Sequence, residues 1–526
     1  MANSPNVAKS KPTFRAVGEL LWEYRARHPA KPAIVDVDQG KVITFGELAA
    51  VVDTLAIQLA RRGARRGSRV ILLADNGIEK ILLWLAIWRA GAAVCPIDVT
   101  FIGSAASSTL RAIGPDLIIV AGDGDPPAVF SDVAAGVLRF PSWQPEIAGG
   151  SGADDELCFS TAADEEQTQK LPSAAIDDIA SMTCTSGTTS LPKIILYDHA
   201  ALWENGQVAI DFLGLTGRDR TLEYRSLGWY SPQILSLMPF LQTGLTLHVA
   251  HRFSISRLPD WIEQYRITMC AGVPTVINML LHQPVARAAE RFSCLRIMTC
   301  SSAPLSTAQW LRFEEIYGVR LLNLYGSSEM GWICANRHDR RKIGTVGPVV
   351  ESVELRVVDD SGMACAPGVE GQIIVNAAKA AVGHLRDDGS VEALRGKPLK
   401  TRDLGFMDQE GYMRLMGRTD DLIIRGGVKI SPLEIEEALA AHDGVLEAVV
   451  VGLPDPIYGQ QPVGFIVPKS GIRLDEAAIL EHCANSLARE KVPKRVFIVD
   501  ALPRSARGKL LRIKLRSDYR TALQNQ

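Results

Sequence analysis

Apolar and polar residues near the start of the chain are grouped in a way that predicts strands and helices in turn. Continuous apolar runs at residues 70–73, 92–95 and 117–120 predict buried strands, and the apolar stretch at residues 78–90 predicts a helix. Strands that are apolar on both faces are typical of parallel sheets covered by helices. The pattern therefore predicts an α/β fold, and the same alternation resumes between residues 179 and 375.

The pattern changes near residue 398, where turn-forming residues separate shorter apolar runs. Ser431, Pro432 and Glu434 predict a capping box with proline at the first helical position, so a helix should begin there. Three apolar runs predict strands that alternate with a helix over about residues 475–490. These runs are residues 448–451, 464–467 and 496–499.

Composition narrows the classes of function. The chain has 526 residues, with 57 Lys and Arg against 59 Asp and Glu, so its formal charge of −2 gives no general affinity for nucleic acid or anionic membranes. No apolar run reaches the ~18 residues of a membrane-spanning helix, and the polar, basic N-terminus does not resemble a signal peptide. We therefore expect a cytoplasmic protein without a membrane span.

The cysteines and histidines do not form a recognisable metal or disulfide pattern. The nine cysteines contain no CxxC pair, and the nine histidines show no ligand spacing such as HExxH. We expect reduced core cysteines and no structural metal.

The segment from Thr185 to Lys193 is the most informative for chemistry. It carries five hydroxyl side chains between two apolar runs, so we expect a loop between strands. Backbone N–H groups and hydroxyls on such a loop can bind phosphate oxygens, and the lysine adds positive charge. The segment is neither a GxxxxGK[S/T] loop nor a GxGxxG loop. Residue types alone leave open a Ser/Thr-rich turn without a ligand.

Further motifs distinguish a phosphate-binding loop from a turn without a ligand. The segment resembles the TSGTTGxPKG phosphate loop of the adenylate-forming (ANL) superfamily, which includes the acyl-CoA synthetases (AMP-dependent synthetase-ligases). Other motifs of that family follow in order: YGSSE at residues 325–329, GTVGP at 344–348, TRDLG at 401–405, GRTDD at 417–421 and LPRSARGK at 502–509. Several matches in the same order as in the family indicate that the resemblance is not a coincidence.

The resemblance implies a domain organisation. It predicts a large N-terminal domain of layered sheets and helices at residues 1–417, which binds ATP and the acid. A hinge at residues 418–421, with Asp420 as its pivot, leads to a small mobile α+β domain at residues 422–526. In the family this domain rotates between adenylation and the thiol step.

The resemblance also implies an activity. The chain would join a carboxylic acid to ATP, giving acyl-AMP and pyrophosphate, and then transfer the acyl group to CoA. The apolar residues of the predicted pocket favour an aromatic or short- to medium-chain monocarboxylic acid. Two alternatives stay open, an adenylating enzyme that acylates a carrier protein or an amine, and a non-catalytic nucleotide-binding relative. The exact acid, regulation by lysine acylation and the oligomeric state, including a homodimer, are left open too.

The predicted catalytic residues would neutralise the negative charges of the two substrates. Bringing a carboxylate and ATP together requires neutralisation and an in-line geometry. By resemblance, Thr188 and Glu329 position Mg²⁺, and Lys509 bridges the acid carboxylate and the α-phosphate as negative charge builds. Asp403 accepts hydrogen bonds from the ribose hydroxyls, and Arg418 adds a ribose or phosphate contact.

The remaining predicted site residues also come from the resemblance. The nucleotide site comprises Thr185, Ser186, Gly187, Thr189, Lys193, Ser302, Ala303, Pro304, Tyr325 (a face for adenine), Gly326, Ser327 and Ser328 (beside the α-phosphate). The acid pocket comprises Trp229, Gly272, Ser301, Met330 and Gly331, and the CoA channel passes Gly426 and Gly427.

The chain departs from the family pattern at several glycines. Ser190 and Ile194 replace two glycines of the phosphate loop, and Arg402 replaces the glycine of the TGDLG motif. Ser301 and Ser302 replace the paired glycines of a GGAPL motif. If Ser190 is held at positive φ, the serine is strained, whereas Ser301 and Ser302 would narrow the space that glycines leave.

Overall fold

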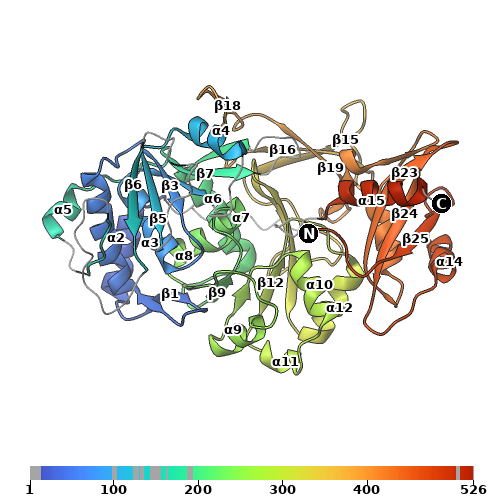
Figure 1. Cartoon of the computed structure of the whole chain (residues 1–526), viewed down its shortest axis with the longest axis horizontal. Coiled ribbons are helices and arrows are strands. Elements are labelled where there is room, and N and C mark those ends of the chain that lie inside the picture. The colour runs from blue at the N-terminus through green and yellow to red at the C-terminus, as the bar shows by residue number, and fades with distance from the viewer. Residues whose placement is uncertain are drawn as a thin grey trace, which may run out of the picture. The chain divides into compact units, whose positions relative to one another are not determined.

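The chain forms two compact units, shown as a computed structural model in Figure 1. The structure describes residues 13–97, 104–122, 130, 135–142, 156–161, 164–185, 193–504 and 510–524. Unit 1 comprises Met1–Asp36, Gly40–Glu204 and His384–Val391, and unit 2 comprises Val37–Gln39, Asn205–Gly383 and Glu392–Gln526. Three elements include a boundary between the units: α6 (His199–Leu213), β17 (Gly383–Leu385) and β18 (Val391–Ala393).

The strands of unit 1 form a largely parallel sheet, as their continuous apolar runs predict. Pairs β3–β4, β3–β5, β5–β6 and β4–β7 are parallel, and β7–β8 is antiparallel. The predicted strands are confirmed, with ends shifted by one or two residues. In sheet order the strands are β8 (Lys193–Asp198), β7 (Ile179–Thr185), β4 (Ala93–Ile97), β3 (Arg69–Leu73), β5 (Leu117–Ala121) and β6 (Gly136–Phe140).

Helices of unit 1 pack against this sheet and against one another (Figure 1). A capping box between Thr44 and Glu47 begins α2, because each residue satisfies a backbone N–H of the other. Trp84 and Trp88 of α3 are fully buried, which explains the apolar run that predicted this helix. The bounds are α1 (Val17–Arg27), α2 (Phe45–Arg61), α3 (Ile78–Arg89), α4 (Ser104–Ile113) and α5 (Glu165–Lys170); β1 (Pro32–Asp36) and β2 (Val42–Thr44) form an antiparallel pair.

Strands of unit 2 take part in a second, mainly parallel sheet. Strands β9 to β13 run parallel to one another, and β14 is antiparallel to β13. In sheet order these strands are β14 (Gly331–Ala335), β13 (Arg320–Ser327), β12 (Ile297–Cys300), β11 (Met269–Cys270), β9 (Arg220–Glu223) and β10 (Thr246–Val249). The connecting helices are α7 (Tyr230–Pro232), the π-helix η2 (Gln233–Leu237), α8 (Met238–Thr243), α9 (Leu258–Gln264), α10 (Pro274–His282), α11 (Ala288–Arg291) and α12 (Thr307–Tyr317).

An antiparallel sheet in unit 2 carries the TRDLG segment. Its strands pair in the order β15 (Val353–Val358), β16 (Gly371–Ala377), β19 (Leu399–Met407) and β20 (Met413–Arg418). A buried cluster that includes Tyr325, Met330, Ile373 and Met413 joins β13 and β14 to this sheet. The 3-10 turn η3 (Thr419–Asp421) follows β20.

The end of the chain forms a small α+β layer, coloured orange to red in Figure 1. Alternate residues of its strands enter two separate cores: Val450 and Ile466 pack with α13 and α14, whereas Val449 and Phe465 pack with α15. The predicted strands are confirmed, and the second helix ends earlier than predicted. The strands are β22 (Val428–Ile430), β21 (Ile423–Arg425), β24 (Gly459–Pro468) and β23 (Val445–Asp455), with β25 (Arg495–Ile498) parallel to β24; the helices are α13 (Pro432–Ala440), α14 (Glu476–Ser486) and α15 (Arg512–Gln524).

One local prediction is wrong. Helix α13 begins at Pro432, but the Ser431 side chain makes no capping hydrogen bond. Its hydroxyl instead donates to the carbonyl of Met416, and Glu434 forms an ion pair with Lys491 at 2.7 Å. Tertiary partners therefore take both groups that would have formed the capping box.

The α/β prediction is confirmed for both units. Among the described helices, none combines the length and the apolar character that crossing a lipid bilayer requires.

Candidate functional site

The parallel strands of unit 2 bring distant predicted residues to one sheet edge. Strands β11, β12 and β13 run in the same direction, so their carboxyl ends lie at the same edge. Gly272 follows β11, Ser301 follows β12, and Tyr325 lies near the end of β13. In open α/β sheets, ligands bind outside the carboxyl ends of the strands. The sheet therefore gathers residues of the predicted acid pocket and of the predicted nucleotide site.

Tyr325, Asp403 and Arg418 form one hydrogen-bonded group at this edge. The Tyr325 hydroxyl donates to Oδ2 of Asp403 at 2.5 Å, and the Arg418 guanidinium donates to Oδ1 at 2.8 Å. Asp403 and Arg418 lie directly opposite each other in the β19–β20 pair. Two elements far apart in the sequence, the YGSSE strand and the TRDLG strand, thus converge on one carboxylate.

Burial shifts the pKa of both acidic groups in this set. It raises the pKa of the Tyr325 hydroxyl far above its usual range, and the neighbouring Asp403 charge acts in the same direction. Tyr325 is therefore a neutral donor. Burial also raises the pKa of Asp403, although the bonds from Tyr325 and Arg418 oppose that rise.

The predicted acid pocket is tightly built around Gly272 and Ser301. A Cβ on Gly272 would lie 2.2 Å from the Thr299 carbonyl oxygen, so no larger residue fits without a shift. Ser301 is 4% exposed, and its hydroxyl has no hydrogen-bond partner within the part of the chain that the structure describes. Trp229 is half-buried and directly precedes α7.

The YGSSE segment turns sharply into β14. Ser327 pairs with Gly331, and the Ser327 hydroxyl accepts the backbone N–H of Met330 at 3.1 Å. Gly331 has a φ of +70°, and a Cβ there would lie 2.1 Å from Oδ1 of Asn205. Asn205 accepts the backbone N–H of Trp332 at 2.9 Å. The glycine is thus required by a close approach.

Glu329 lies in this turn between Ser328 and the fully buried Met330. Its side chain is half-buried, and its carbonyl accepts the N–H of Ala381 at 2.8 Å. One carboxylate with neighbouring hydroxyls is a hard oxygen donor set. Such a set suits Mg²⁺, which retains water and phosphate ligands.

Two of the replaced glycines are at positive φ. Ser302 has a φ of +76° and Arg402 a φ of +64°, a region in which residues other than glycine are uncommon. Ser302, Ala303 and Pro304 follow β12 as an exposed to half-exposed segment. Both backbones therefore adopt a conformation that favours the glycine of the family motif.

The phosphate loop lies partly outside the described residues. Thr185 ends β7 and pairs directly with Lys193, the first residue of β8, so two described strands flank the predicted loop. Lys193 is exposed. The loop residues themselves, Ser186, Gly187, Thr188, Thr189 and Ser190, lie outside the described part of the chain, while Ile194 is buried in β8.

Lys509 also lies outside the described residues, but the segment before it is placed. Arg504 donates to the Thr275 hydroxyl at 3.1 Å and pairs with Glu447 at 2.5 Å. Thr275 is in α10, directly after the turn that holds Gly272. The LPRSARGK segment therefore begins beside the predicted acid pocket.

Gly426 and Gly427 form the exposed turn between β21 and β22, with φ values of +56° and +86°. A Cβ on Gly427 would meet nothing within 4 Å. Asp420 lies in η3, where Arg402 approaches its carboxylate at 3.3 Å.

Some residues around the site were missed by sequence reasoning. Lys379 is 1% exposed, and its ammonium group donates to the carbonyl of Trp332. Glu223 and Arg225 form a fully buried ion pair at 2.6 Å, completed by the hydroxyls of Ser231 and Ser236. A lone lysine or arginine in a sequence is usually exposed, so nothing in the pattern indicated these positions.

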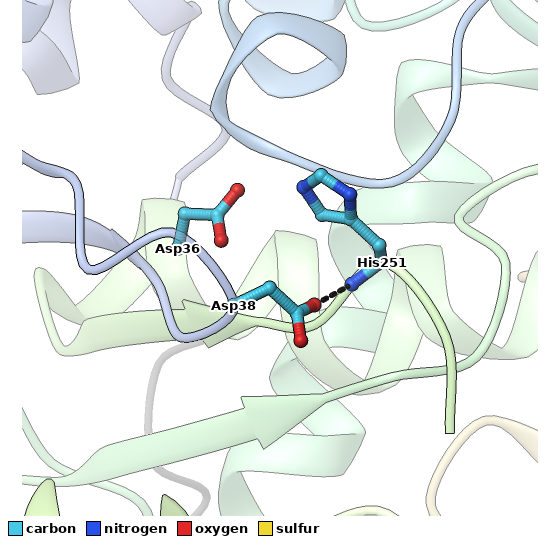
Figure 2. A group of neighbouring side chains, drawn as sticks. All are labelled: Asp36, Asp38 and His251. Carbon is cyan, nitrogen blue, oxygen red and sulfur yellow. Dashed lines mark hydrogen bonds between the residues drawn. The ribbon is translucent and has the colours of Figure 1, made fainter. Parts of the chain in front are cut away.

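Asp38 and His251 form a separate polar contact in unit 2 (Figure 2). The Asp38 carboxylate accepts the backbone N–H of His251 at 2.6 Å and pairs with Arg257 at 2.5 Å. Both carboxylate oxygens are thereby engaged in joining the loop after β10 to residues 37–39.

Comparison with known proteins agrees with the geometry. The model of the family described as AMP-binding enzyme matches residues 21–384, and that of the AMP-binding enzyme C-terminal domain matches residues 434–509. A sulfoacetate–CoA ligase of Cupriavidus necator is 30% identical over 514 residues, 97% of this chain and 99% of the relative. An indoleacetate–CoA ligase of Aromatoleum aromaticum is 31% identical over 504 residues, 94% of this chain and 96% of the relative.

Solved structures are similar over almost the whole chain. ATP-bound MatB from Rhodopseudomonas palustris has a TM-score of 0.80 at 26% identity, covering 96% of this chain and 99% of its own. The anthranilate CoA ligase AuaEII in complex with anthranoyl-AMP has a TM-score of 0.83 at 25% identity, covering 98% and 99%.

Proposed function

This chain belongs to the AMP-binding enzyme family, and on that premise we propose that it joins an aromatic or short- to medium-chain monocarboxylic acid to CoA through an acyl-adenylate. It is an AMP-forming acid–CoA ligase that uses ATP and CoA as co-substrates. The observation that carries the proposed chemistry is the carboxylate of Asp403, held by Tyr325 and Arg418 at the carboxyl edge of the unit 2 sheet.

The proposed reaction has two displacements. In the first, a carboxylate oxygen of the acid attacks the α-phosphorus of ATP, and pyrophosphate leaves. In the second, the sulfur of CoA, after loss of its proton, attacks the acyl carbon, and AMP leaves. Asp403 would accept hydrogen bonds from the ribose hydroxyls in both steps. The nucleotide would then stay in place while the acid reacts first and CoA second.

Lys509 would act in the first step. Its ammonium group would contact the acid carboxylate and the α-phosphate, where it offsets the negative charge that builds on phosphorus. The contact between Arg504 and Thr275 supports this role, because it anchors the segment five residues before Lys509 beside α10. Lys509→Ala should abolish acyl-adenylate formation but leave thioester formation from preformed acyl-AMP.

Glu329 and Thr188 would hold Mg²⁺. The ion would supply neutralisation of the phosphate charge when bound. Glu329 offers the hard oxygen that such a site requires, and its backbone is fixed by Ala381 and by the turn into β14. The 186–192 loop would bind the β- and γ-phosphates through its backbone N–H groups.

The acid would bind near Gly272, Ser301 and Met330. The buried Ser301 hydroxyl is available to a polar atom of the acid. Any side chain at position 272 would clash with the Thr299 carbonyl, so this position requires glycine. The indoleacetate and anthranilate ligases among the similar proteins support an aromatic acid. Sulfoacetate, the substrate in the name of another relative, carries a second anionic group, so both kinds of acid belong in a test.

The test is mass spectrometry after incubation with ATP, Mg²⁺, CoA and a panel of acids: benzoate, anthranilate, indoleacetate, ferulate, butyrate, octanoate, sulfoacetate and oxalate. A new acyl-CoA with equimolar AMP from an aromatic or aliphatic monocarboxylic acid supports the proposal. Acyl-AMP without thioester would indicate a carrier protein or an amine as acceptor. Turnover only of sulfoacetate or oxalate would contradict the substrate class.

A further inference from the structure

Strand β19 bulges at Arg402. Gln372 of β16 pairs with Leu404, whereas Ile374 pairs with Lys400, so residues 401–403 stand opposite Ile373 alone. The Thr401 hydroxyl closes the bulge by donating to the Ile373 carbonyl at 3.0 Å and accepting the N–H of Asp403 at 3.1 Å. Bulges of this kind often redirect a side chain at a functional site, and Asp403 is the last residue of this one.

The bulge also directs Arg402 toward η3, the segment predicted as the hinge. The Arg402 guanidinium lies 3.3 Å from the Asp420 carboxylate. The backbone carbonyl of Arg402 accepts a hydrogen bond from the Thr419 hydroxyl at 3.3 Å. Arg418 approaches the same Asp420 carboxylate at 3.7 Å while it holds Asp403. One charged group thus connects the proposed ribose ligand to the proposed pivot.

The arginine is not needed to build the strand. Its φ of +64° favours glycine, the residue that the family motif has at this position. The side chains of Arg402 and Asp420 are 63% and 52% exposed, so their ion pair contributes little to the stability of the fold. Neither the backbone conformation nor the stability of the fold therefore explains an arginine at this position. This points to a role for the Arg402 side chain in the hinge.

An ion pair that exists in only one conformation shifts a two-state equilibrium by its full strength. In the conformation observed here, Arg504, five residues before Lys509, contacts Thr275, three residues after Gly272 of the predicted acid pocket. Rotation at Asp420 would change the backbone of η3 and separate its carboxylate from Arg402. The pair therefore opposes that rotation.

We propose that Arg402 is a positioning residue that latches η3 in the adenylating conformation and delays the change to the thioester-forming one. The inference rests on the proposed function. Loss of the latch should speed acyl transfer from preformed acyl-AMP to CoA by about two- to five-fold, the range open to an exposed ion pair. Adenylation in a single turnover should stay the same or slow slightly.

The experiment compares Arg402→Gly, Arg402→Ala and Arg402→Lys with the unaltered chain. Glycine removes both the side chain and the strain, alanine removes the side chain alone, and lysine retains the charge. Both half-reactions are measured in single turnovers at low and high salt. Salt should speed acyl transfer in the unaltered chain and have less effect in the glycine and alanine variants, because it screens the pair.

Hydrogen exchange supplies a readout that needs no turnover. The backbone amides of residues 419–421 should exchange faster in the glycine and alanine variants, with lysine restoring most of the protection. Arg312→Ala, which breaks an exposed Arg312–Glu315 pair in α12, is the matched control and should change neither readout. Unchanged exchange at residues 419–421 would overturn the latch. A complete lack of acyl-AMP and acyl-CoA, with faster exchange, would instead count against the proposed function alone.

Discussion

The Tyr325 hydroxyl donates to the Asp403 carboxylate at 2.5 Å, and this bond joins two segments that are 78 positions apart in the sequence. Tyr325 lies near the end of β13 in the mainly parallel sheet, while Asp403 is the last residue of a bulge in the antiparallel sheet. Because Arg418 holds the other oxygen of the carboxylate, the geometry of Asp403 is set from two sides. The proposed ribose contact thus belongs to a preorganised group.

Replacing Asp403 by Asn should weaken ATP binding. Asn retains the shape of Asp but loses the charge and one acceptor, and a hydrogen bond to a charged group contributes about 1.5–3 kcal/mol. We expect KM for ATP to rise on the order of 10- to 100-fold, with a smaller change in KM for CoA, as measured by steady-state kinetics. Asp359→Asn alters a carboxylate in an exposed turn and is the control. An unaltered KM for ATP in Asp403→Asn would remove Asp403 from the nucleotide site.

Acidification should impair ATP binding at a higher pH than it would if Asp403 had the pKa of an ordinary aspartate. Burial raises the pKa of Asp403, so the carboxylate takes up a proton at a higher pH and loses an acceptor for the ribose. The Tyr325 hydrogen bond opposes this rise, so Tyr325→Phe should move the acid limb of kcat/KM for ATP to still higher pH. A pH profile of both proteins measures the shift. An acid limb that moves to lower pH in Tyr325→Phe would contradict the assigned donor.

Gly427→Ala should affect the thioester step and spare adenylation. An added methyl group meets nothing within 4 Å in the structure, but it would narrow the CoA channel that the family resemblance predicts at this turn. Gly411→Ala is a matched control, since Gly411 also lies in a turn at positive φ with open space around it. Both changes carry the same backbone cost of about 1 kcal/mol. Equal rates of acyl transfer in the two variants would argue against a CoA channel at Gly427.

His199 in unit 1 should make the fold sensitive to mild acid. Burial lowers the pKa of this histidine to about 4, and its ring packs against Trp88 and Phe14. Between pH 6.5 and pH 4 the unfolded chain binds a proton that the folded chain does not, so stability falls as the pH falls. The loss amounts to about 2 kcal/mol between pH 7 and pH 5.

Urea unfolding of the unaltered chain and of His199→Phe at these two pH values measures this loss. Phenylalanine keeps a ring against Trp88 but does not titrate. The variant should therefore lose less stability on acidification than the unaltered chain. Equal losses would show that other groups cause the acid sensitivity.

The sequence predicted those parts of the fold that depend on local pattern. The apolar runs at residues 70–73 and 117–120 become β3 and β5 because a strand buried on both faces has few alternatives. The capping box at Ser431 failed because its hydroxyl has a tertiary partner, the Met416 carbonyl, that the local pattern does not contain. Local propensity is a sound guide only where no distant group competes for the same atoms.

The candidate site was predictable as a set of residue types but not as a geometry. The motifs named Tyr325, Asp403 and Arg418, yet only the fold brings them together: Asp403 and Arg418 pair across β19 and β20, and Tyr325 reaches Asp403 from β13. Lys379 was missed because lysine is ordinarily exposed, and its burial depends on the carbonyl of Trp332. The latch between Arg402 and Asp420 likewise follows from a backbone conformation that an arginine rarely adopts.

Oxygen-isotope transfer shows whether the acid is activated as an acyl-adenylate. An acid labelled with heavy oxygen in its carboxylate would be incubated with the enzyme, ATP, Mg²⁺ and CoA, and the products analysed by mass spectrometry. Attack of the carboxylate on the α-phosphorus predicts one labelled oxygen in AMP for each acyl-CoA formed, and none in pyrophosphate. Acyl-CoA formed with unlabelled AMP, or with the label in orthophosphate, would contradict the account.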